Sequence, residues 1–386
     1  LENNTSGGAN VAIGSWDTST YQAPLTTNQV GSFNIAIGSG ALRLANDDSV
    51  DGSIGIGYGA LNEHVGNSSN ARFANTAIAI GYKALLQMTS GSGNLAIGYS
   101  SGLNVTTGAD NLGVGEKTLG GNSSTAITGD ANTAVGWSAG SNLEGAAANN
   151  SIFGKNAGYA LTTGVDNTIL GTQAADALLT GNKNVAIGRL ALSSSQDADN
   201  CIAIGYAAMN ANNDANSDGS IAIGYAAMNN LSTGAGNVGV GFEVMKQATT
   251  GKHNTSVGYQ SMFNAMNVGD SNTAMGYQSL YSLDPDTDDH GSNTAVGKQS
   301  GYDVSTGTGN VLVGANAGNS GSNDLTTGDN NTYIGNEATG SASGAVNQTV
   351  IGALATGQQN NSVTLGNANV TDVFMGQDSG ALVACS

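Results

Sequence analysis

Two five-residue frames have the residue types of a hydrolase nucleophile elbow. They are residues 98–102 (Gly-Tyr-Ser-Ser-Gly) and 136–140 (Gly-Trp-Ser-Ala-Gly). A serine at the centre of such a frame acts as a nucleophile when it lies on a sharp strand-to-helix turn and has a histidine partner. Residues 154–158 repeat the same frame without a serine, and the three histidines of the chain fall in different repeats. We therefore expect no catalytic residue and no enzyme activity.

Two acidic loops form a second chemical candidate. Residues 47–52 and 214–219 share the frame Asp-x-Ser/Asn-x-Asp-Gly, which places oxygen atoms at alternate positions around a sharp turn, as calcium loops do. The candidate ligands are Asp47, Ser49, Asp51, Asp214, Asn216 and Asp218. The bidentate Glu of an EF-hand is missing, and Asp-Gly is also a common solvated turn. Calcium is the one cofactor that we consider, and a plain turn is the competing interpretation.

Aromatic residues at recurring positions are candidates for receptor binding. Exposed rings can stack on the sugars of a host glycan, whereas rings that cover one another only stabilise a stack. Two long insertions near the N-terminus add further candidates, because insertions lie on the surface, where binding residues concentrate. The predicted receptor contacts are Trp16, Tyr21, His64, Arg72, Phe73, Tyr206, Tyr225, Tyr259 and Tyr277.

All these residues belong to one repeated unit, the phrase Asn-x-Ala-Ile/Val-Gly. Its glycines are Gly14, Gly38, Gly57, Gly81, Gly98, Gly115, Gly136, Gly154, Gly171, Gly188, Gly205, Gly224, Gly241, Gly258, Gly276, Gly297, Gly314, Gly335, Gly352 and Gly366. These are 20 units, and nine of their 19 spacings are 17 residues. A short fixed period of β-formers and glycine indicates stacked coils. We predict an all-β fold, a parallel β-roll or β-solenoid of about 20 short coils.

Each unit begins with a short strand. The residue before the glycine is large and apolar in all 20 units, whereas the residue before that is Ala, Gly or Ser in 14 of them. We predict that the large residues face inward and the small ones form a flat outer surface. A second strand is predicted after the glycine, as in residues 206–209, so that the coils build two sheets.

Two columns are predicted inside the stack. Asn stands four residues before the glycine in 14 units, and stacked amides can hydrogen-bond from coil to coil. Met209, Met228, Met245 and Met262 recur in register and are predicted to fill the core. Because so thin a core leaves the flat surface in water, we predict that chains pack side by side as a homotrimer.

The composition limits the partners. A net charge of −18 in 386 residues disfavours binding to nucleic acid, and no segment has the apolar length of a membrane span. Cys201 and Cys385 lie too far apart for a disulfide between neighbouring coils. We divide the chain into one repetitive domain, residues 1–366, and a C-terminal extension, residues 367–386.

Two families share parts of this pattern. Residues 184–188 (Asn-Val-Ala-Ile-Gly) and 220–224 (Ser-Ile-Ala-Ile-Gly) resemble the head repeats of trimeric autotransporter adhesins, which form left-handed parallel β-rolls side by side as a homotrimer. Residues 352–366 have the usual spacing of that family, and the other units are longer. The Tyr-x-Ala-Leu and Leu-Thr-Thr-Gly variants, followed by residues 362–376, resemble the long tail fibres of bacteriophages, in which such a segment often precedes a cleaved chaperone.

The resemblance implies a structural fibre of a virion that binds a glycan or protein receptor on the host cell surface. The alternative is a trimeric adhesin or filament subunit on a bacterial cell surface. An ice-binding solenoid is a third class, but it requires regular Thr-x-Thr arrays, which the sequence lacks.

Overall fold

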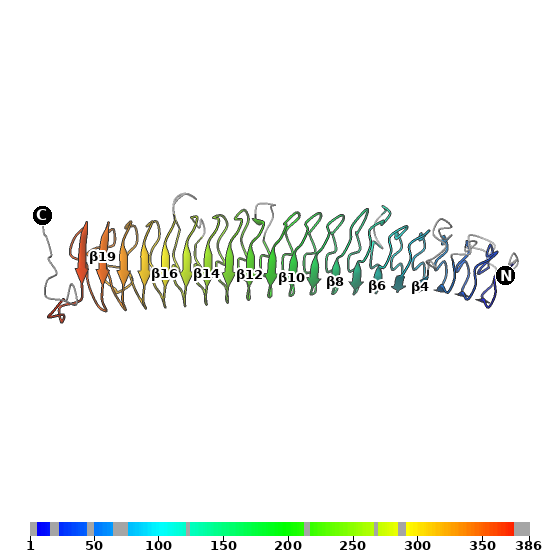
Figure 1. The fold of residues 1–386 in the computed structure, drawn as a ribbon, viewed down its shortest axis with the longest axis horizontal. Helices are drawn as coiled ribbons and strands as arrows, with labels where there is room; N and C mark the ends of the chain where they lie inside the picture. Colours follow the sequence, from blue (N-terminus) through cyan, green and yellow to red (C-terminus); the bar gives the residue numbers. More distant parts are fainter. Residues whose placement is uncertain are drawn as a thin grey trace, which may run out of the picture. The chain divides into compact units, whose positions relative to one another are not determined.

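The computed structural model describes residues 6–15, 23–44, 50–64, 76–120, 124–211, 217–265, 269–284 and 291–373. Contacts between residues cluster into two compact units, Leu1–Ser220 and Ile221–Ser386. Both units consist of coils that each contribute one parallel strand (Figure 1). The predicted all-β solenoid is therefore confirmed, and the assignment of residues 1–366 to one domain stays a prediction.

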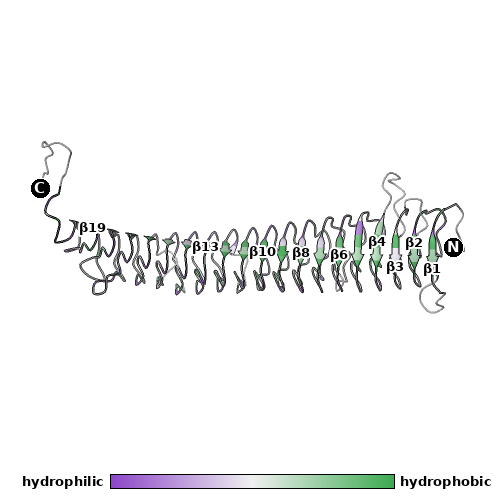
Figure 2. Cartoon of the chain, turned by 90° about the horizontal axis from the view of Figure 1, so that it is seen from below, coloured by the Kyte–Doolittle hydropathy of each residue, from purple (hydrophilic) through white to green (hydrophobic). Residues whose placement is uncertain are grey.

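In the first unit, each strand pairs in parallel with the next strand along the chain, and equivalent positions face each other, as Ala186 faces Ala203. The strands are β1 (Val11–Ile13), β2 (Ile35–Ile37), β3 (Ile54–Ile56), β4 (Ala77–Ile80), β5 (Asn94–Ile97), β6 (Leu112–Val114), β7 (Thr133–Val135), β8 (Ser151–Phe153), β9 (Thr168–Leu170), β10 (Val185–Ile187) and β11 (Ile202–Ile204). Figure 2 shows that strands β1, β2 and β4 are mainly hydrophobic.

The second unit has the same parallel order and register, as in the pairing of Ala274 with Ala295. Its strands are β12 (Ile221–Ile223), β13 (Val238–Val240), β14 (Thr255–Val257), β15 (Thr273–Met275), β16 (Thr294–Val296), β17 (Val311–Val313), β18 (Thr332–Ile334), β19 (Gln348–Ile351) and β20 (Ser362–Leu365).

The small middle residue of most strands faces the interior, so the predicted orientation of the strands was wrong. In β10, Ala186 is fully buried, while the residues on either side are only partly buried. A large residue four positions after the repeat glycine fills the coil instead. A Cβ on Gly239, in the middle of β13, would lie 2.7 Å from Cε of Met228 in the preceding coil. Because such side chains occupy the centre, the strand has room only for a small residue.

In β8 and β9, a large residue occupies the middle of the strand, and glycine takes the core position of the preceding coil. Ile152 and Ile169 are fully buried in the middle of β8 and β9. A Cβ on Gly140 would lie 3.0 Å from Ile152, and a Cβ on Gly158 would lie 3.2 Å from Ile169. The exchange keeps the filled volume nearly constant. The predicted methionine column is confirmed as core, because its members are fully buried: Met209, Met228, Met245 and Met262.

The segment after the repeat glycine is a turn, so the predicted second strand was also wrong. In residues 206–209, Ala207 and Met209 have φ angles of 52° and 49°. Extended strands require negative φ, so two left-handed residues in four bend the chain. Among the described residues, each coil therefore adds one strand to a single sheet in its unit.

The predicted asparagine column is confirmed. Nδ2 of Asn184 donates to Oδ1 of Asn167 in the preceding coil (3.1 Å) and to the carbonyl of Ala198 (2.6 Å). The main-chain N–H of Asn184 also donates to Oδ1 of Asn167 (3.0 Å). These side chains are fully buried, so the column satisfies polar groups that would otherwise lack partners.

The side chain of Tyr333 is an exception to this pairing of buried polar groups. Tyr333, in the middle of β18, is fully buried, and its hydroxyl has no hydrogen-bond partner among the described residues. Burial also raises its pKa. An unpaired buried hydroxyl costs about 1–3 kcal/mol, so we expect Tyr333→Phe to raise the free energy of unfolding by about 1 kcal/mol in urea denaturation. Tyr277→Phe, at an exposed site, should leave it unchanged. A loss of stability in Tyr333→Phe would show that the hydroxyl is bonded.

Candidate binding surfaces

The serines of the two elbow-like frames lie in the turn that every coil repeats. Ser100 and Ser138 are buried, have φ angles of 52° and 55°, and use their main-chain N–H groups to bond the preceding coil. Asn156 occupies the same turn with φ 55°. The described residues contain no helix to complete a nucleophile elbow. The frames are thus accounted for by the repeat, and the absence of catalysis stays a prediction.

Of the predicted calcium ligands, the structure describes only Asp51 and Asp218. Asp47, Ser49, Asp214 and Asn216 lie outside the described residues. Both described carboxylates bind the main chain of the preceding coil: Asp51 accepts the N–H of Ser32 (2.5 Å), and Asp218 accepts the N–H of Asp199 (2.9 Å). No group of three acidic, His or Cys side chains that could hold a metal occurs in the described ranges. These two residues therefore act as turn caps.

The turn-cap role predicts that calcium contributes nothing to stability. A ligand that binds only the folded chain raises its melting temperature. We expect scanning calorimetry with and without EDTA to give the same melting temperature. A decrease in EDTA that added Ca²⁺ reverses would show that the loops bind the ion.

The predicted aromatic column forms stacked ladders. Tyr225, Phe242, Tyr259 and Tyr277 lie with ring centroids 5.0–5.4 Å apart and interplanar angles of 5–9°. Tyr82 stacks in the same way on Tyr58 and Tyr99 in the first unit. Because neighbouring rings cover each other's faces, the inner rings offer their edges and hydroxyls to a ligand. Stacking of sugars on these faces is thus restricted to the ends of a ladder.

The other predicted receptor contacts give a mixed result. Tyr206 is 41% exposed, and Arg189 lies over its ring at 5.7 Å. His64 is fully buried, so the prediction that it contacts a receptor was wrong: it ends a turn and its side chain lies inside the coil. Trp16, Tyr21, Arg72 and Phe73 lie outside the described residues.

A large apolar surface, which we call the outer face, was not predicted. It consists of the two residues of each strand that flank the middle residue and point away from the interior. Leu170 is 48% exposed, Met275 45% and Ile351 40%. None of these positions in β1–β20 holds a charged residue or histidine. Apolar surfaces of this extent mark interaction sites. The alternation of large and small residues was visible in the sequence, but it does not say which set points inward.

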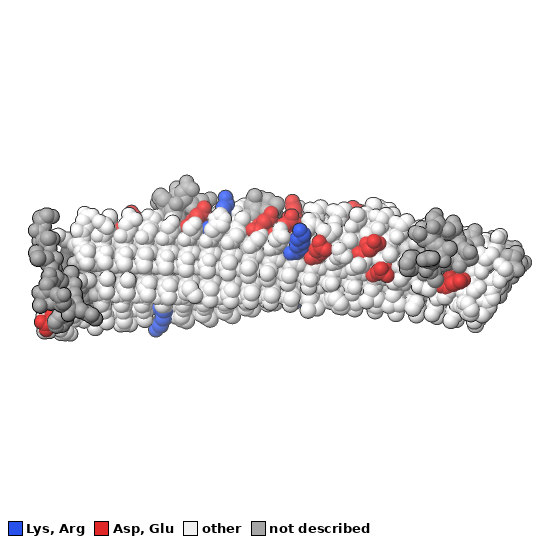
Figure 3. Space-filling model, viewed as in Figure 1, with Lys and Arg blue, Asp and Glu red and all other residues white. Residues whose placement is uncertain are grey.

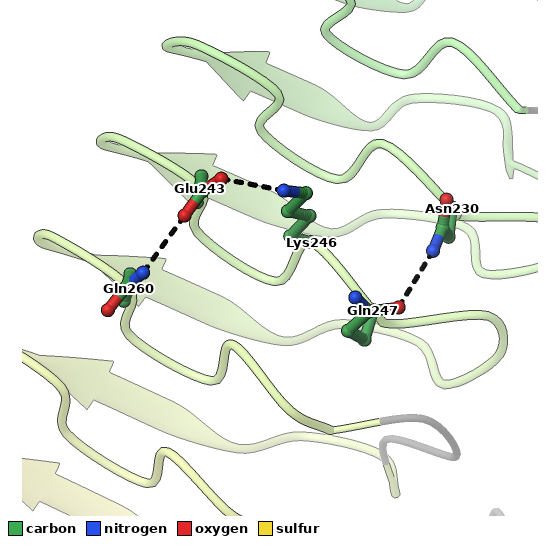
Figure 4. A network of polar contacts seen from close by, with 5 residues as sticks. All are labelled: Asn230, Glu243, Lys246, Gln247 and Gln260. Atoms are coloured by element: carbon green, nitrogen blue, oxygen red, sulfur yellow. Dashed lines mark hydrogen bonds and ion pairs between the residues drawn. The ribbon is translucent and has the colours of Figure 1, made fainter.

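A second polar ladder, which we call the glutamine rail, follows the strands of the second unit. Nε2 of Gln260 donates to Glu243 (2.9 Å), Nε2 of Gln278 to Gln260 (3.0 Å), and Nε2 of Gln299 to Gln278 (3.2 Å). Figure 4 shows Glu243 between Gln260 and Lys246, with which it forms an ion pair of 2.6 Å. Burial opposes ionisation of Glu243, but the bonds from Lys246 and Gln260 outweigh it and lower its pKa.

A second ring ladder lies next to the rail. It consists of Phe263, Tyr281 and Tyr302, whose successive centroids are 5.4 and 4.8 Å apart. Nζ of Lys246 lies 5.7 Å from the Phe263 ring. The sequence contains the signal for both ladders in residues 258–263 and 276–281 (Gly-Tyr-Gln-Ser-Met/Leu-Phe/Tyr).

Charged side chains are sparse on the face of the molecule shown in Figure 3. Among the described residues, no helix is long and apolar enough to cross a membrane. No family model and no curated protein matches this chain.

Proposed function

We propose that the chain is the shaft of a tail fibre with which a bacteriophage attaches to its host. In this proposal, three copies pack side by side along the outer face, the fibre is part of the virion, and its partner is a glycan or protein of the host cell surface. Catalysis, nucleic-acid binding and membrane insertion are not part of the proposed role.

The observation that carries the proposal is the outer face. It is mainly apolar, with Thr or Ser at one of its two positions in eight strands, and it is free of charged residues in every strand. It is partly exposed in the single chain, although the chain as a whole has a net charge of −18. Covering the exposed half of a Leu or Ile side chain stabilises a complex by about 1 kcal/mol. Because the face repeats in every coil, this gain accumulates along the strands. The outer face, rather than the small residues in the middle of the strands, is therefore the surface that we propose for chain packing.

The oligomeric state of two matched variants tests this assembly. Leu170 and Ile187 belong to the outer face, whereas Leu179 and Tyr159 lie in turns and are 37% and 38% exposed. We expect sedimentation velocity to give three times the chain mass of 38.1 kDa for the unmodified protein. The pair Leu170→Lys with Ile187→Lys should sediment at a lower mass, because lysines must leave water to enter the interface. The pair Leu179→Lys with Tyr159→Lys should remain trimeric. Equal masses for both pairs would contradict the proposed interface.

The bacterial adhesin or filament subunit remains the second candidate, because it would use the same coil and outer face. The complete gene distinguishes the two. A self-cleaving chaperone domain following the repeats would support the bacteriophage fibre, whereas an outer-membrane anchor would support the adhesin and overturn the proposal.

A further inference from the structure

The glutamine rail and the rings on either side of it form one continuous strip on the second unit. The rail residues and the rings stand on the turns that follow strands β13–β16, rather than on the outer face. Tyr259 and Tyr277 directly precede the rail residues Gln260 and Gln278 in the sequence, and the rings Phe263, Tyr281 and Tyr302 follow Gln260, Gln278 and Gln299 by three residues. We call these residues the rail strip.

Contacts at equivalent positions show that the three columns of the rail strip are neighbours. Glu243 of the rail forms an ion pair with Lys246, which occupies the position of the second ring ladder, and Lys246 lies over the ring of Phe263. In the first unit, Lys83 occupies the rail position and lies 5.3 Å from the ring of Tyr82. A ligand on the rail is therefore within reach of both ring columns.

The rail keeps hydrogen-bonding capacity for a ligand. A glutamine amide has two N–H donors and two acceptor sites on its oxygen. Gln278 uses one donor to bond Gln260 and one acceptor site to receive Gln299. One donor and one acceptor site remain, and the side chain is partly exposed. Tyr259 and Tyr277, which are 45% and 46% exposed, add ring edges and hydroxyl groups beside these amides.

We propose that the rail strip binds a neutral, extended, β-linked glycan that runs from coil to coil. Such a chain repeats hydroxyl groups that match the remaining donors and acceptors, and its C–H groups pack against the ring edges. The charged residues at the rail strip are Glu243, which is paired with Lys246, and Lys298, which takes the position of Tyr277 in the next coil. The net charge of −18 of the whole chain disfavours an anionic polymer. A peptide strand would gain its specificity from pockets for alternate side chains, whereas identical side chains recur along each column here. The inference rests on the proposed receptor-binding function and names its ligand class.

Calorimetric titration of the full chain with cellohexaose and chitohexaose tests this inference. Gln278→Leu keeps most of the side-chain volume but removes the amide. The matched control is Gln247→Leu, because Gln247 also forms an amide pair between coils, with Asn230 (2.9 Å), but lies outside the rail strip (Figure 4). We expect at least one hexasaccharide to bind and Gln278→Leu to weaken its binding about tenfold, the effect of losing about 1.4 kcal/mol. Gln247→Leu should bind like the unmodified chain, and thermal melting should confirm that both variants are folded.

Three results would overturn the inference. The first is the absence of binding to both hexasaccharides. The second is equal binding of a hexasaccharide by Gln278→Leu and the unmodified chain. The third is tighter binding of dextran sulfate or an uncharged Gly-Ser peptide than of either hexasaccharide. The mass of each sample, measured by sedimentation, separates this inference from the proposed assembly. A trimer that binds no glycan would contradict only the proposed glycan binding by the rail strip. A sample with the mass of a single chain would contradict the proposed trimer.

Discussion

Replacing Gly335 with alanine is expected to lower the free energy of unfolding by roughly 4 kcal/mol. Gly335 directly follows β18 and has φ 144°, a conformation that L-residues rarely adopt. A Cβ there would lie 2.5 Å from the carbonyl oxygen of Gly352 and 2.6 Å from its carbonyl carbon. Because both atoms belong to the main chain of the next coil, the clash cannot be relieved by a side-chain rotation. Denaturant unfolding followed by circular dichroism measures the change.

Gly344→Ala provides the matched control for this experiment. Gly344 lies in the same unit, its φ is not positive, and the nearest atom to an added Cβ is Oγ1 of Thr327 at 3.4 Å. We expect Gly344→Ala to change stability by less than about 1 kcal/mol. Equal stability of the two alanine variants would contradict the close contact between each repeat glycine and the main chain of the next coil.

Replacing Asn167 with aspartate is expected to destabilise the first unit by about 3 kcal/mol at pH 7. Nδ2 of Asn167 donates to Oδ1 of Asn150 (3.0 Å) and to the carbonyl of Gly181 (2.9 Å). Aspartate keeps the acceptor that Asn184 uses, but it turns a carboxylate oxygen toward two other oxygens. Since Asn167 is fully buried, water cannot compensate for the two lost bonds.

The same substitution should make stability depend on pH. Burial and the two facing oxygens raise the pKa of the new carboxyl group in the folded state above its unfolded value. The protonated acid can donate one of the lost bonds, so the variant should lose stability as the pH rises from the unfolded pKa through the raised folded pKa, and regain it in acid. Denaturant unfolding at pH 7 and pH 4 checks this. Asn200→Asp, at an exposed site with only a main-chain bond to the preceding coil, should show neither effect. A stable Asn167→Asp at pH 7 would contradict the amide column.

Much of the coil was predictable because its strongest constraints act on single residue types. The repeat glycine is fixed by its φ angle and by the main chain of the next coil, as at Gly335, so it marks every coil in the sequence. The Asn column is fixed by the bonds that each amide makes to two neighbouring groups. Such positions tolerate few alternatives and therefore recur with little variation.

The direction of the strand residues was not predictable from alternation alone. Period-two patterns divide a strand into two faces without saying which one is buried. The deciding signal lay elsewhere, in the exchange between residues such as Ile169 and Gly158, which must share one interior space. Glycines at left-handed positions of the turn, such as Gly59 with φ 66°, likewise indicated a turn where a strand was predicted.

The candidate binding surfaces were only partly predictable. The aromatic column was visible because its members follow the repeat glycine directly. The glutamine rail and the second ring ladder were missed, since each column covers only a few coils and its partners are 17–21 residues apart in the sequence. His64 was misplaced because its long insertion suggested a surface loop, whereas the residue itself closes a buried turn.

Oxidation of Met275 tests most directly whether the outer face is covered by other copies of the chain. Met275 is 45% exposed in the single chain, whereas Met245 is fully buried inside the coil. Hydrogen peroxide converts accessible methionine to its sulfoxide, which mass spectrometry detects peptide by peptide. The account predicts that Met275 in the native protein reacts as slowly as Met245, and that both react quickly in urea. Rapid oxidation of Met275 in the native protein, with Met245 protected, would show that the outer face is open to water and would contradict the proposed assembly.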